Sequence, residues 1–456
     1  MTNLQNLSIE DEAFFQDLRS TEYKRLDSES PHIYLDYTGG NLYAESLIKK
    51  HHNFLLNGVY GNPHSINPTS EISTHLIEEA RDKVIKFFNA DDYFCVFTPN
   101  ASGSLKIVGE SYPFNKDSHF VLLADNHNSV NGIREYCRNK SGQLEYVPVQ
   151  YEDLQINDAA LKESLTKCAH AGNNLFAFPA QSNVSGVKHS LSWIQYAHDL
   201  GYDVLLDAAA FVPTSKLDLK QVHPEFVTIS FYKIFGYPTG IGCLLIRKSV
   251  FHKLQKPWFA GGTVTMVSVA APNSFLVNNH ERFEDGTLNY LDIPAIKNGL
   301  EYIESIGIDR INNRIKHLTI GLIDQLQKLQ HSNGVPVVKI FGPKDTNVRG
   351  GNIVMNFYNA DGSIVPFETI DIIAKEKNIS IRSGCFCNPG IDEINNCITN
   401  EEMTQYFVSR DEGDYHDMVH YLGKMRGATR VSMGIATTTK DLEIFIDLLK
   451  NHFNLS

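Results

Sequence analysis

Short apolar runs recur along the middle of the chain, and they constrain its fold more than any other feature. Helical stretches separate the runs, so the pattern alternates between strand and crossover. The runs are Tyr93–Thr98, His119–Leu123, Leu175–Pro179, Asp203–Asp207, Phe226–Ser230 and Gly242–Ile246. Apolar strands joined by crossovers predict an α/β fold with a mostly parallel sheet that is covered on both faces.

An amphipathic helix is predicted before these strands, over Glu71–Phe88. Its apolar residues recur at a spacing that places them on one face of a helix. They are Ile72, Leu76, Ala80, Val84 and Phe87. We expect this helix to lie on the surface of the protein with that face turned inward.

The pattern changes after the strands and predicts a second, smaller domain. The expected elements are a long helix over Ile296–Leu329, strands near Gly351–Phe357 and Ile379–Arg382, and a final helix over Lys440–Phe453. We therefore predict an N-terminal segment over residues 1–30, a large domain over 31–294 and a small α+β domain over 295–456, with the boundary near Pro294. The polar, acidic stretch Asn388–Gly427 is the least regular, and we interpret it as mobile or partner-facing.

Composition and charge disfavour several classes of protein. Hydrophobic residues make up 42% of the chain, enough for a substantial core, and the formal net charge of −12 with no dense Lys/Arg run disfavours nucleic-acid binding. The polar start, Met1–Phe14, does not resemble a secretory signal, and no apolar run reaches the length of a membrane span. Seven cysteines, an odd number, favour a reducing compartment. We expect a cytoplasmic protein with a small-molecule or protein partner.

Several residues that follow the apolar runs suit one cofactor, because ligands collect at the carboxyl ends of parallel strands. Asp207 could pair with a protonated ring nitrogen, and Lys233 could form a Schiff base with an aldehyde. Thr98–Gly103 could hold a phosphate where a helix begins, and His127 could lie over an aromatic ring. Taken singly, Asp207 would be a helix cap or turn residue, and Lys233 would be a surface charge. Thr98–Gly103 would be a loop, and His127 would be an ordinary loop histidine.

The segment SFYKIFGYPTGIG at Ser230–Gly242 resembles the cofactor-lysine segment of class V aminotransferases and cysteine desulfurases. Other segments resemble, more narrowly, the aminotransferase-like domain of molybdenum cofactor sulfurases. They are YGNPHS at Tyr60–Ser65, PAQSNVSG at Pro179–Gly186, FEDGT at Phe283–Thr287 and RSGCFCNPG at Arg382–Gly390. The resemblance extends from about Tyr34 to the final helix. It implies a pyridoxal-phosphate enzyme of fold type I, whose large domain contains a mostly parallel seven-stranded sheet.

The resemblance implies a role for each residue around the cofactor ring. Lys233 would bind pyridoxal 5'-phosphate covalently, and Asp207 would pair with the pyridine nitrogen. His127 would stack on the ring as a catalytic residue. Asn183 would hydrogen-bond the ring hydroxyl oxygen.

The resemblance also implies how the phosphate of the cofactor is held. Ala101, Ser102 and Ser230 would surround it. Thr263, which follows two glycines, would reach the phosphate of the neighbouring subunit. That last role implies a homodimer.

Cys385-Phe386-Cys387 is the predicted sulfur site, since Gly384 lets the chain bend and expose a thiol. Sulfur transfer needs a thiolate, which an accessible, electropositive setting favours. The two cysteines alone could instead bind a metal or be small buried residues, although no second Cys/His pair at a suitable spacing accompanies them. The resemblance selects Cys387 as the nucleophile and leaves Cys385 as a resolving or relay thiol.

Arg430, in the segment Thr429–Ser432, is the predicted substrate-binding residue. By itself it would be interpreted as a surface charge at the edge of a strand. The resemblance implies that it binds the carboxylate of the substrate, a task that suits a planar bidentate donor.

The resemblance, carried by these residues, implies a cysteine desulfurase that converts L-cysteine to alanine and leaves a persulfide on Cys387. A C–S lyase or an aminotransferase of the same fold would need Lys233 but not Cys387, and a non-catalytic scaffold is a further alternative. Molybdenum cofactor sulfurases usually carry another C-terminal domain, whereas the expected final helix here is followed closely by Ser456. The sulfur acceptor, either molybdenum cofactor or a separate protein, therefore stays open, as does the pathway.

Overall fold

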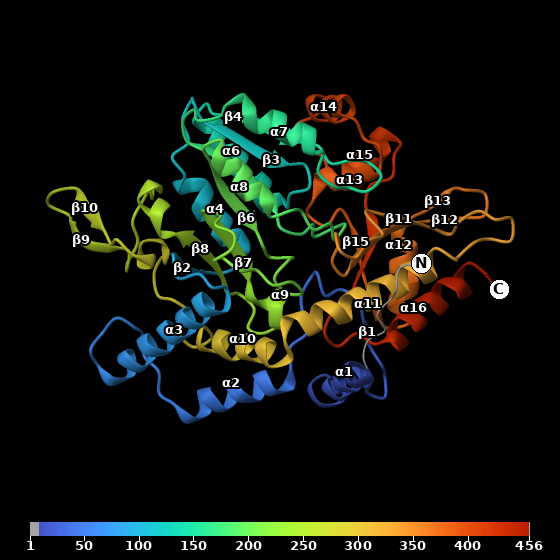
Figure 1. Ribbon diagram of the computed structural model, residues 1–456, viewed down its shortest axis with the longest axis horizontal. Helices are drawn as coiled ribbons and strands as arrows, with labels where there is room; N and C mark the ends of the chain where they lie inside the picture. The colour runs from blue at the N-terminus through green and yellow to red at the C-terminus, as the bar shows by residue number, and fades with distance from the viewer. Residues whose placement is uncertain (1–8, 456) are drawn as a thin grey trace.

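The centre of the computed structural model, which describes residues 9–455, is a seven-stranded sheet (Figure 1). Its strands, in spatial order, are β2 (Tyr93–Thr98), β8 (Gly242–Arg247), β7 (Phe226–Ser230), β6 (Tyr202–Asp207), β5 (Asn174–Pro179), β3 (His119–Leu123) and β4 (Gln143–Val147). Strand β8 runs antiparallel to both of its neighbours, and the other pairs are parallel. The predicted α/β fold is confirmed. The predictions for residues 1–8, the start of the expected N-terminal segment, lie outside the described residues.

The six strands predicted from apolar runs are all present. Three have the predicted bounds, and β5, β6 and β8 differ from the prediction by one residue. Strand β4 was not predicted, because it forms the edge of the sheet and most of its residues are partly exposed. An edge strand does not need the continuous apolar run that marks a strand buried on both faces.

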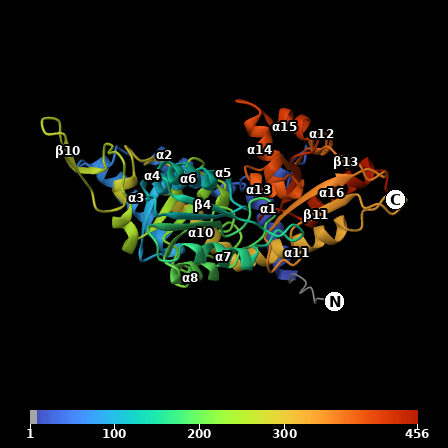
Figure 2. The ribbon, with the colours of Figure 1, turned by 90° about the horizontal axis from the view of Figure 1, so that it is seen from above.

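Helices cover both faces of the sheet. Along β3, Phe120 and Leu122 pack into one core, and Val121 and Leu123 pack into the other. Seen from above, α4 and α6 lie on one side of the strands, and α7 and α8 lie on the other (Figure 2). The helices of this part are α2 (Glu45–Asn57), α3 (Pro68–Phe87), α4 (Ala101–Ser111), α5 (Asn128–Asn131), α6 (Ile133–Asn139), α7 (Asp158–Lys167), α8 (Ser192–Asp199) and α9 (Phe231–Phe235).

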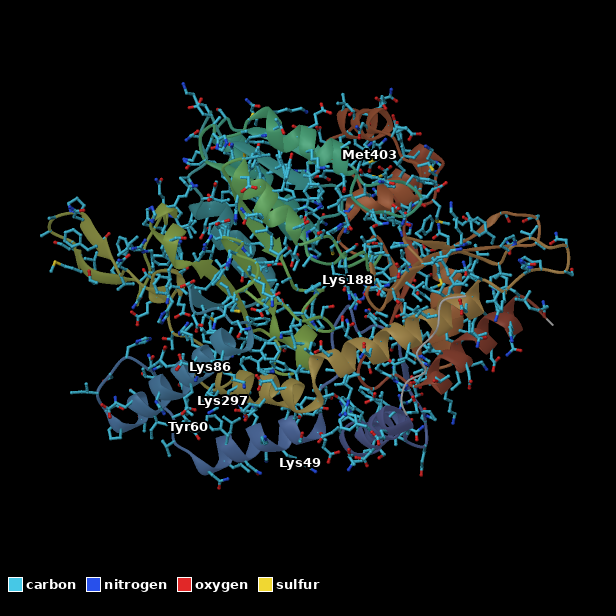
Figure 3. The ribbon with its side chains drawn as sticks, in the orientation of Figure 1. Lys49, Tyr60, Lys86, Lys188, Lys297 and Met403 are labelled. Atoms are coloured by element: carbon cyan, nitrogen blue, oxygen red, sulfur yellow. The ribbon has the colours of Figure 1, made fainter. Side chains whose placement is uncertain are left out.

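Helix α3 confirms the predicted amphipathic helix and corrects its inner face. It begins earlier than predicted, at Pro68, after the Asn67 side chain caps it by accepting from the backbone N–H of Ser70. Ala80 and Val84 are fully buried as expected, but Ile72 is 46% exposed. Lys297 on α10 (Pro294–Ile306) forms an ion pair of 2.8 Å with Glu79 on α3 (Figure 3).

A second sheet, of five strands, forms the C-terminal part of the described chain. Its order is β11 (Val338–Phe341), β12 (Asn352–Tyr358), β16 (Ala428–Ser432) and β15 (Arg382–Gly384), with β13 (Ile364–Val365) also paired to β12. The strand predicted over Ile379–Arg382 is divided, because β14 (Ile379–Ser380) pairs with β1 (Ile33–Tyr34) and β15 pairs with β16. The division of the chain into domains at Pro294 stays a prediction.

The single long helix predicted over Ile296–Leu329 is wrong. It is two helices, α10 and α11 (Ile308–Leu326), which meet at Gly307 with φ of 91°. That backbone conformation ends a helix and is available mainly to glycine. The remaining helices of this part are α12 (Phe367–Glu376), α13 (Pro389–Asn395), α14 (Asn400–Val408), α15 (Tyr415–Leu422) and α16 (Thr439–His452).

The stretch Asn388–Gly427 is more regular than predicted. It contains α13, α14 and α15, which are short helices joined by polar turns. The Thr399 side chain and Glu402 form a capping box at the start of α14, and Asp414 caps α15. The stretch carries acidic residues where its helices begin, and these residues explain why its sequence was interpreted as irregular.

A helix at the start, a hairpin and three short 3-10 helices complete the described chain. Helix α1 (Ile9–Glu22) packs against the C-terminal part, where Arg19 forms an ion pair of 2.7 Å with Asp441 on α16. A hairpin, β9 (Val264–Ser268) and β10 (Asn273–Leu276), projects at the left of Figure 1. Short 3-10 helices occupy Lys24–Asp27, Lys248–Lys253 and His280–Phe283. Within residues 9–455, no helix has the length and apolar content needed to cross a membrane.

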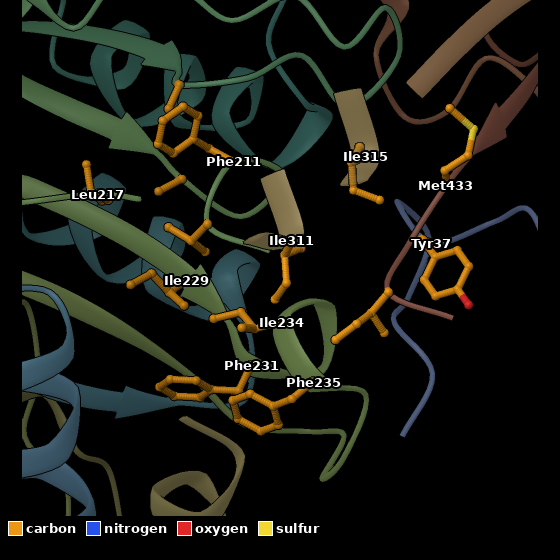
Figure 4. Close-up of a cluster of buried hydrophobic side chains, with 14 of the residues drawn as sticks. Tyr37, Phe211, Leu217, Ile229, Phe231, Ile234, Phe235, Ile311, Ile315 and Met433 are labelled. Carbon is orange, nitrogen blue, oxygen red and sulfur yellow. The ribbon is translucent and has the colours of Figure 1, made fainter. Parts of the chain in front are cut away.

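Apolar side chains join the two sheets next to α9. Ile229 and Ile234 lie in one buried cluster with Ile311, Ile315 and Met433 (Figure 4). The first two flank the segment that carries Lys233, and the others come from α11 and the end of β16. This packing fixes Lys233 relative to the C-terminal part of the chain.

We expect Gly307→Ala to destabilise the protein by about 1–3 kcal/mol, because an added Cβ makes the conformation at φ of 91° unfavourable. Gly321→Ala is the control, since Gly321 lies inside α11 with open space around its Cα and should gain about 0.5–1 kcal/mol. Urea unfolding monitored by circular dichroism measures both changes. Equal urea midpoints for the two variants would contradict the expectation that the conformation at position 307 requires glycine.

Candidate active site

Seven of the predicted site residues line one hollow at the carboxyl ends of the strands. The hollow has a volume of about 170 Å³. The seven residues are Ala101, Ser102, His127, Asn183, Asp207, Ser230 and Lys233. They come from segments that follow β2, β3, β5, β6 and β7, so the sheet brings together residues that are distant in sequence.

Lys233 lies on α9 at the base of this hollow. Burial lowers the pKa of its ammonium, the carboxylate of Asp207 partly opposes that shift, and the charges of Arg430 and Arg382 lower the pKa further. A lowered pKa increases the neutral fraction of the amine. Lys233 therefore has the environment of a nucleophilic lysine that reacts with a carbonyl group.

Hydrogen bonds fix the side chains of Asp207 and His127. Within residues 9–455, these bonds use one polar atom of each side chain and leave the other without a partner. Oδ1 of Asp207 accepts from the backbone N–H of Ala209 at 3.0 Å and from the hydroxyl of Thr228 at 3.3 Å, so Oδ2 is available to a ligand. Nδ1 of His127 accepts from the backbone N–H of Ser129 at 3.1 Å. Burial lowers the pKa of His127, so its ring is neutral at pH 7 and carries its proton on Nε2.

The start of α4 provides an anion site on the other side of the hollow. The Asn100 side chain caps this helix by accepting from the backbone N–H of Gly103 at 3.0 Å. Ala101 donates its backbone N–H to the Ser230 hydroxyl at 2.9 Å, and the hydroxyls of Ser102 and Ser129 are 2.6 Å apart. Hydroxyl groups around the N-terminus of a helix suit a phosphate.

The loop with the two cysteines lies against this hollow. Cys387 is exposed, and its carbonyl accepts from the backbone N–H of Asn128 at 2.7 Å. The Asn183 side chain donates to the Phe386 carbonyl at 2.8 Å and accepts from the Asn388 side chain at 3.1 Å. The amide of Asn183 is thus bonded to the loop, and its predicted bond to a ring hydroxyl stays a prediction.

Cys385 and Cys387 differ in environment. Cys385 is partly buried, and this burial together with the nearby Asp392 carboxylate raises the pKa of its thiol to about 12. Such a thiol is protonated at neutral pH and is a poor nucleophile. Cys387, by contrast, is exposed next to the Lys233 hollow. The structure therefore favours Cys387 as the reactive thiol of the pair.

Arg430 is buried beside the hollow rather than part of its lining. Its Nη2 forms an ion pair with Oδ1 of Asp36 at 2.9 Å, and its Nη1 donates to the Asn183 carbonyl at 2.6 Å. Its Nε is buried and has no hydrogen-bond partner in the described part of the chain. The Phe386 ring covers the guanidinium at 4.9 Å. An unpaired buried N–H donor next to the hollow fits the predicted contact with a substrate carboxylate.

The sequence interpretation missed two buried carboxylates that organise this region. Asp36 binds Arg430 and also Arg382, the latter at 2.7 Å. Asp125, which is fully buried, accepts from Ser182 and Asn388 at 2.8 Å each. Arg382 and Asn388 belong to the segment RSGCFCNPG, so their place in that segment was a usable signal. Asp36 and Asp125 are distant in sequence from these partners and gave no local signal.

Thr263 lies outside the Lys233 hollow of its own chain. It is buried in a turn, where its hydroxyl is 2.9 Å from both the carbonyl and the backbone nitrogen of Ala260. Its predicted contact with the phosphate of a second subunit stays a prediction. Across the described residues, no group of three or more His, Cys, Asp or Glu side chains is arranged to hold a metal ion.

The sequence of the chain matches a known protein family. The model of the class V aminotransferase family matches residues 33–445, and the chain belongs to that family. It is 34% identical to the molybdenum cofactor sulfurases of Arabidopsis thaliana and Homo sapiens, over 96% and 94% of its own length. The chain spans 58% and 50% of the length of those two relatives. The predicted resemblance is confirmed.

Solved structures of cysteine desulfurases share the fold. The apo enzyme from Thermococcus onnurineus NA1 superposes with a TM-score of 0.80 at 24% identity, covering 96% of this chain and 98% of that one. CsdA from Escherichia coli gives 0.76 at 19% identity, with the same coverage. At this level of identity the likeness shows the fold.

The residues present fit pyridoxal phosphate, the cofactor of this family. The site has a buried lysine for the aldehyde, a carboxylate with one free oxygen for the ring nitrogen, and a neutral histidine beside the hollow. The hydroxyls of Ser102, Ser129 and Ser230 lie around the start of α4 and suit the phosphate. The aldehyde, the ring nitrogen, the ring and the phosphate of the cofactor therefore each have a neighbour of suitable chemistry.

We expect iodoacetamide to label Cys387 at least about tenfold faster than Cys385, because a pKa of about 12 leaves only about one Cys385 thiol in 10,000 ionised near pH 8. Peptide mapping by mass spectrometry measures both rates, with the exposed Cys397 as internal reference. Asp392→Asn should speed labelling of Cys385, since it removes a charge that raises the pKa. Equal labelling of the two thiols in the unmodified chain would contradict this assignment.

Proposed function

We propose that the protein is a pyridoxal-phosphate-dependent cysteine desulfurase, which converts L-cysteine to alanine and leaves a persulfide on Cys387. The observation that carries the proposal is the bond from Asn183 to the Phe386 carbonyl. It ties the cysteine loop to a residue of the Lys233 hollow. A reactive thiol beside a lysine that can hold the cofactor is what sulfur transfer needs.

Each residue of the site has a task in this reaction. The bound cofactor supplies an aldehyde for the substrate amine and an electron-withdrawing ring. Lys233 would hold the cofactor. Once the substrate has displaced it, Lys233 would take the proton from the α-carbon of the substrate. Arg430 binds the substrate carboxylate. The Cys387 thiolate would then attack the substrate sulfur, so that an S–S bond forms as the C–S bond breaks. The electron pair of the C–S bond would stay with the β-carbon of the substrate, which would take up a proton to become the methyl group of alanine.

The alternatives on the same fold differ in their need for Cys387. A C–S lyase would release pyruvate and sulfide, and an aminotransferase would leave the sulfur on its product. Neither reaction uses the thiol loop, and a non-catalytic scaffold needs neither the loop nor Lys233. The pairing of the loop with the Lys233 hollow supports the desulfurase.

We expect the protein loaded with pyridoxal phosphate to form alanine from cysteine and to carry a persulfide on Cys387. Cys387→Ala should lower alanine formation at least about 100-fold, because no thiolate remains to take the sulfur, while cofactor binding stays intact. Cys385→Ala is the matched control and should keep most of the first turnover. Alanine is measured by chromatography and the persulfide by mass spectrometry. The proposal fails if pyruvate is the main product or if Cys387→Ala keeps the full rate.

We also propose that the protein is a homodimer. The hairpin β9–β10 begins right after Thr263, projects from the body of the protein and exposes the directly paired side chains Met266 and Phe275, each 63% exposed. Val269 at its tip is fully exposed. A two-stranded hairpin with apolar surface is marginally stable in water, so contact with a second copy would stabilise it.

We expect the double variant Met266→Asp/Phe275→Asp to raise the dimer dissociation constant at least about tenfold, because charges would be buried without partners. Val408→Asp is the control, since Val408 is 82% exposed on α14, far from the hairpin. Sedimentation velocity at several concentrations measures the change. A monomer in the unmodified protein, or an unchanged dimer in the double variant, would argue against the hairpin as the interface.

The acceptor of the sulfur is proposed only as a class. Molybdenum cofactor is the acceptor that the names of the relatives suggest, and a separate protein is the alternative. The chain spans about half the length of those relatives. The acidic hollow that Cys387 lines favours a separate protein as the acceptor.

A further inference from the structure

A second hollow, of about 750 Å³, is lined by both cysteines of the loop. Cys385 and Cys387 form one wall, and helices α14 and α15 with the turn between them form the other. Phe386, between the two cysteines, instead covers Arg430. The two hollows share no lining residue, and Cys387 borders the second one. A sulfur atom bound to Cys387 would be presented to whatever fills it.

The far wall of this hollow is apolar and aromatic. Tyr406, Phe407, Tyr415 and Met418 line it. Phe407 is 63% exposed, and its neighbour Val408 is 82% exposed. Exposed apolar side chains next to a concave surface are typical of sites that bind a protein partner.

The charge of the hollow is negative. Its two arginines are already paired, Arg410 with Asp417 and Arg426 with Asp392. Three further carboxylates line it, those of Asp411, Glu412 and Asp414, and none of them has a cationic partner among residues 9–455. Like charges repel, so a phosphate-bearing acceptor would be disfavoured here, whereas a lysine- or arginine-rich segment would be attracted.

We propose that a basic segment of a separate protein docks in this hollow and presents a cysteine thiol to the Cys387 persulfide. The proposal rests on the proposed desulfurase activity and narrows its acceptor. The acceptor thiolate attacks the outer sulfur of the persulfide, the S–S bond to Cys387 breaks, and Cys387 leaves as a thiolate. The proton lost by the acceptor thiol ends on Cys387. The step turns a persulfide on Cys387 and a thiol on the acceptor into a thiol on Cys387 and a persulfide on the acceptor. It therefore needs no oxidant or reductant.

Binding to the resting protein tests this inference without any turnover. The probe is a fluorescent lysine-rich peptide with a single cysteine, compared with a glutamate-rich peptide of the same length, at low ionic strength. We expect the lysine-rich peptide to bind at least about tenfold more tightly by fluorescence anisotropy. Asp411→Lys/Glu412→Lys should remove that preference, and Asp411→Asn/Glu412→Gln should reduce it. Both changes lie in an exposed turn.

A matched charge reversal elsewhere separates this hollow from the overall negative charge. Asp82→Lys/Asp324→Lys makes the same change in net charge on exposed positions of α3 and α11 and should leave peptide binding unchanged. Equal binding of the two peptides, or equal effects of the two charge reversals, overturns the proposal. Competition by pyrophosphate as effective as that of the lysine-rich peptide also overturns it, in favour of an anionic small-molecule acceptor.

Transfer of sulfur gives a second, separable readout. After one turnover with cysteine, the persulfide on Cys387 should pass to the lysine-rich peptide faster than to the glutamate-rich one. The Asp411→Lys/Glu412→Lys variant should form its own persulfide at the normal rate. It should then pass the sulfur to both peptides equally fast. Failure to form any persulfide would count against the proposed function. A persulfide that forms normally and passes to both peptides equally fast would count against the docking site alone.

Discussion

The arrangement around Cys387 depends on a buried carboxylate, that of Asp125. Its oxygens bond the Ser182 hydroxyl, the Asn388 side chain and the His189 ring, the last at 3.1 Å. These partners come from the segment after β5 and from the end of the cysteine loop. A buried carboxylate without partners is unfavourable, so each partner is held in place. One side chain near the end of β3 thereby fixes the cysteine loop next to the hollow that Lys233 lines.

The fold was predictable wherever burial leaves a pattern in the sequence. Strands buried on both faces appear as continuous apolar runs, and for this reason β2, β3 and β7 were predicted with their observed bounds. The edge strand β4 has partly exposed residues and was missed. The break at Gly307 was missed as well, because the apolar spacing continues through it. The stretch that contains helices α13 to α15 was interpreted as irregular and as mobile or partner-facing, since its caps and turns use the residues typical of loops.

The candidate site was predictable in a similar, limited way. The sheet brings the residues after its strands to one edge, so Lys233, Asp207 and His127 could be expected to meet. Arg430 and Cys387 were named through a resemblance to a family. Their surroundings depend on partners hundreds of residues away, such as Asp36 for Arg430. Such a pair has no spacing that could reveal it, and a single sequence gives no other sign of the contact.

The register between β15 and β16 places Arg382 directly opposite Arg430. Two like charges in that position repel each other, and the carboxylate of Asp36 is the group that holds both. Asp36 belongs to neither strand and lies close to the start of the described chain. A shortened protein that begins after this residue would retain every family segment from YGNPHS onward, including both cysteines of the loop and Lys233. It would nevertheless lose the counter-charge of Arg430, so the shortest chain that keeps this site intact is longer than the family segments suggest.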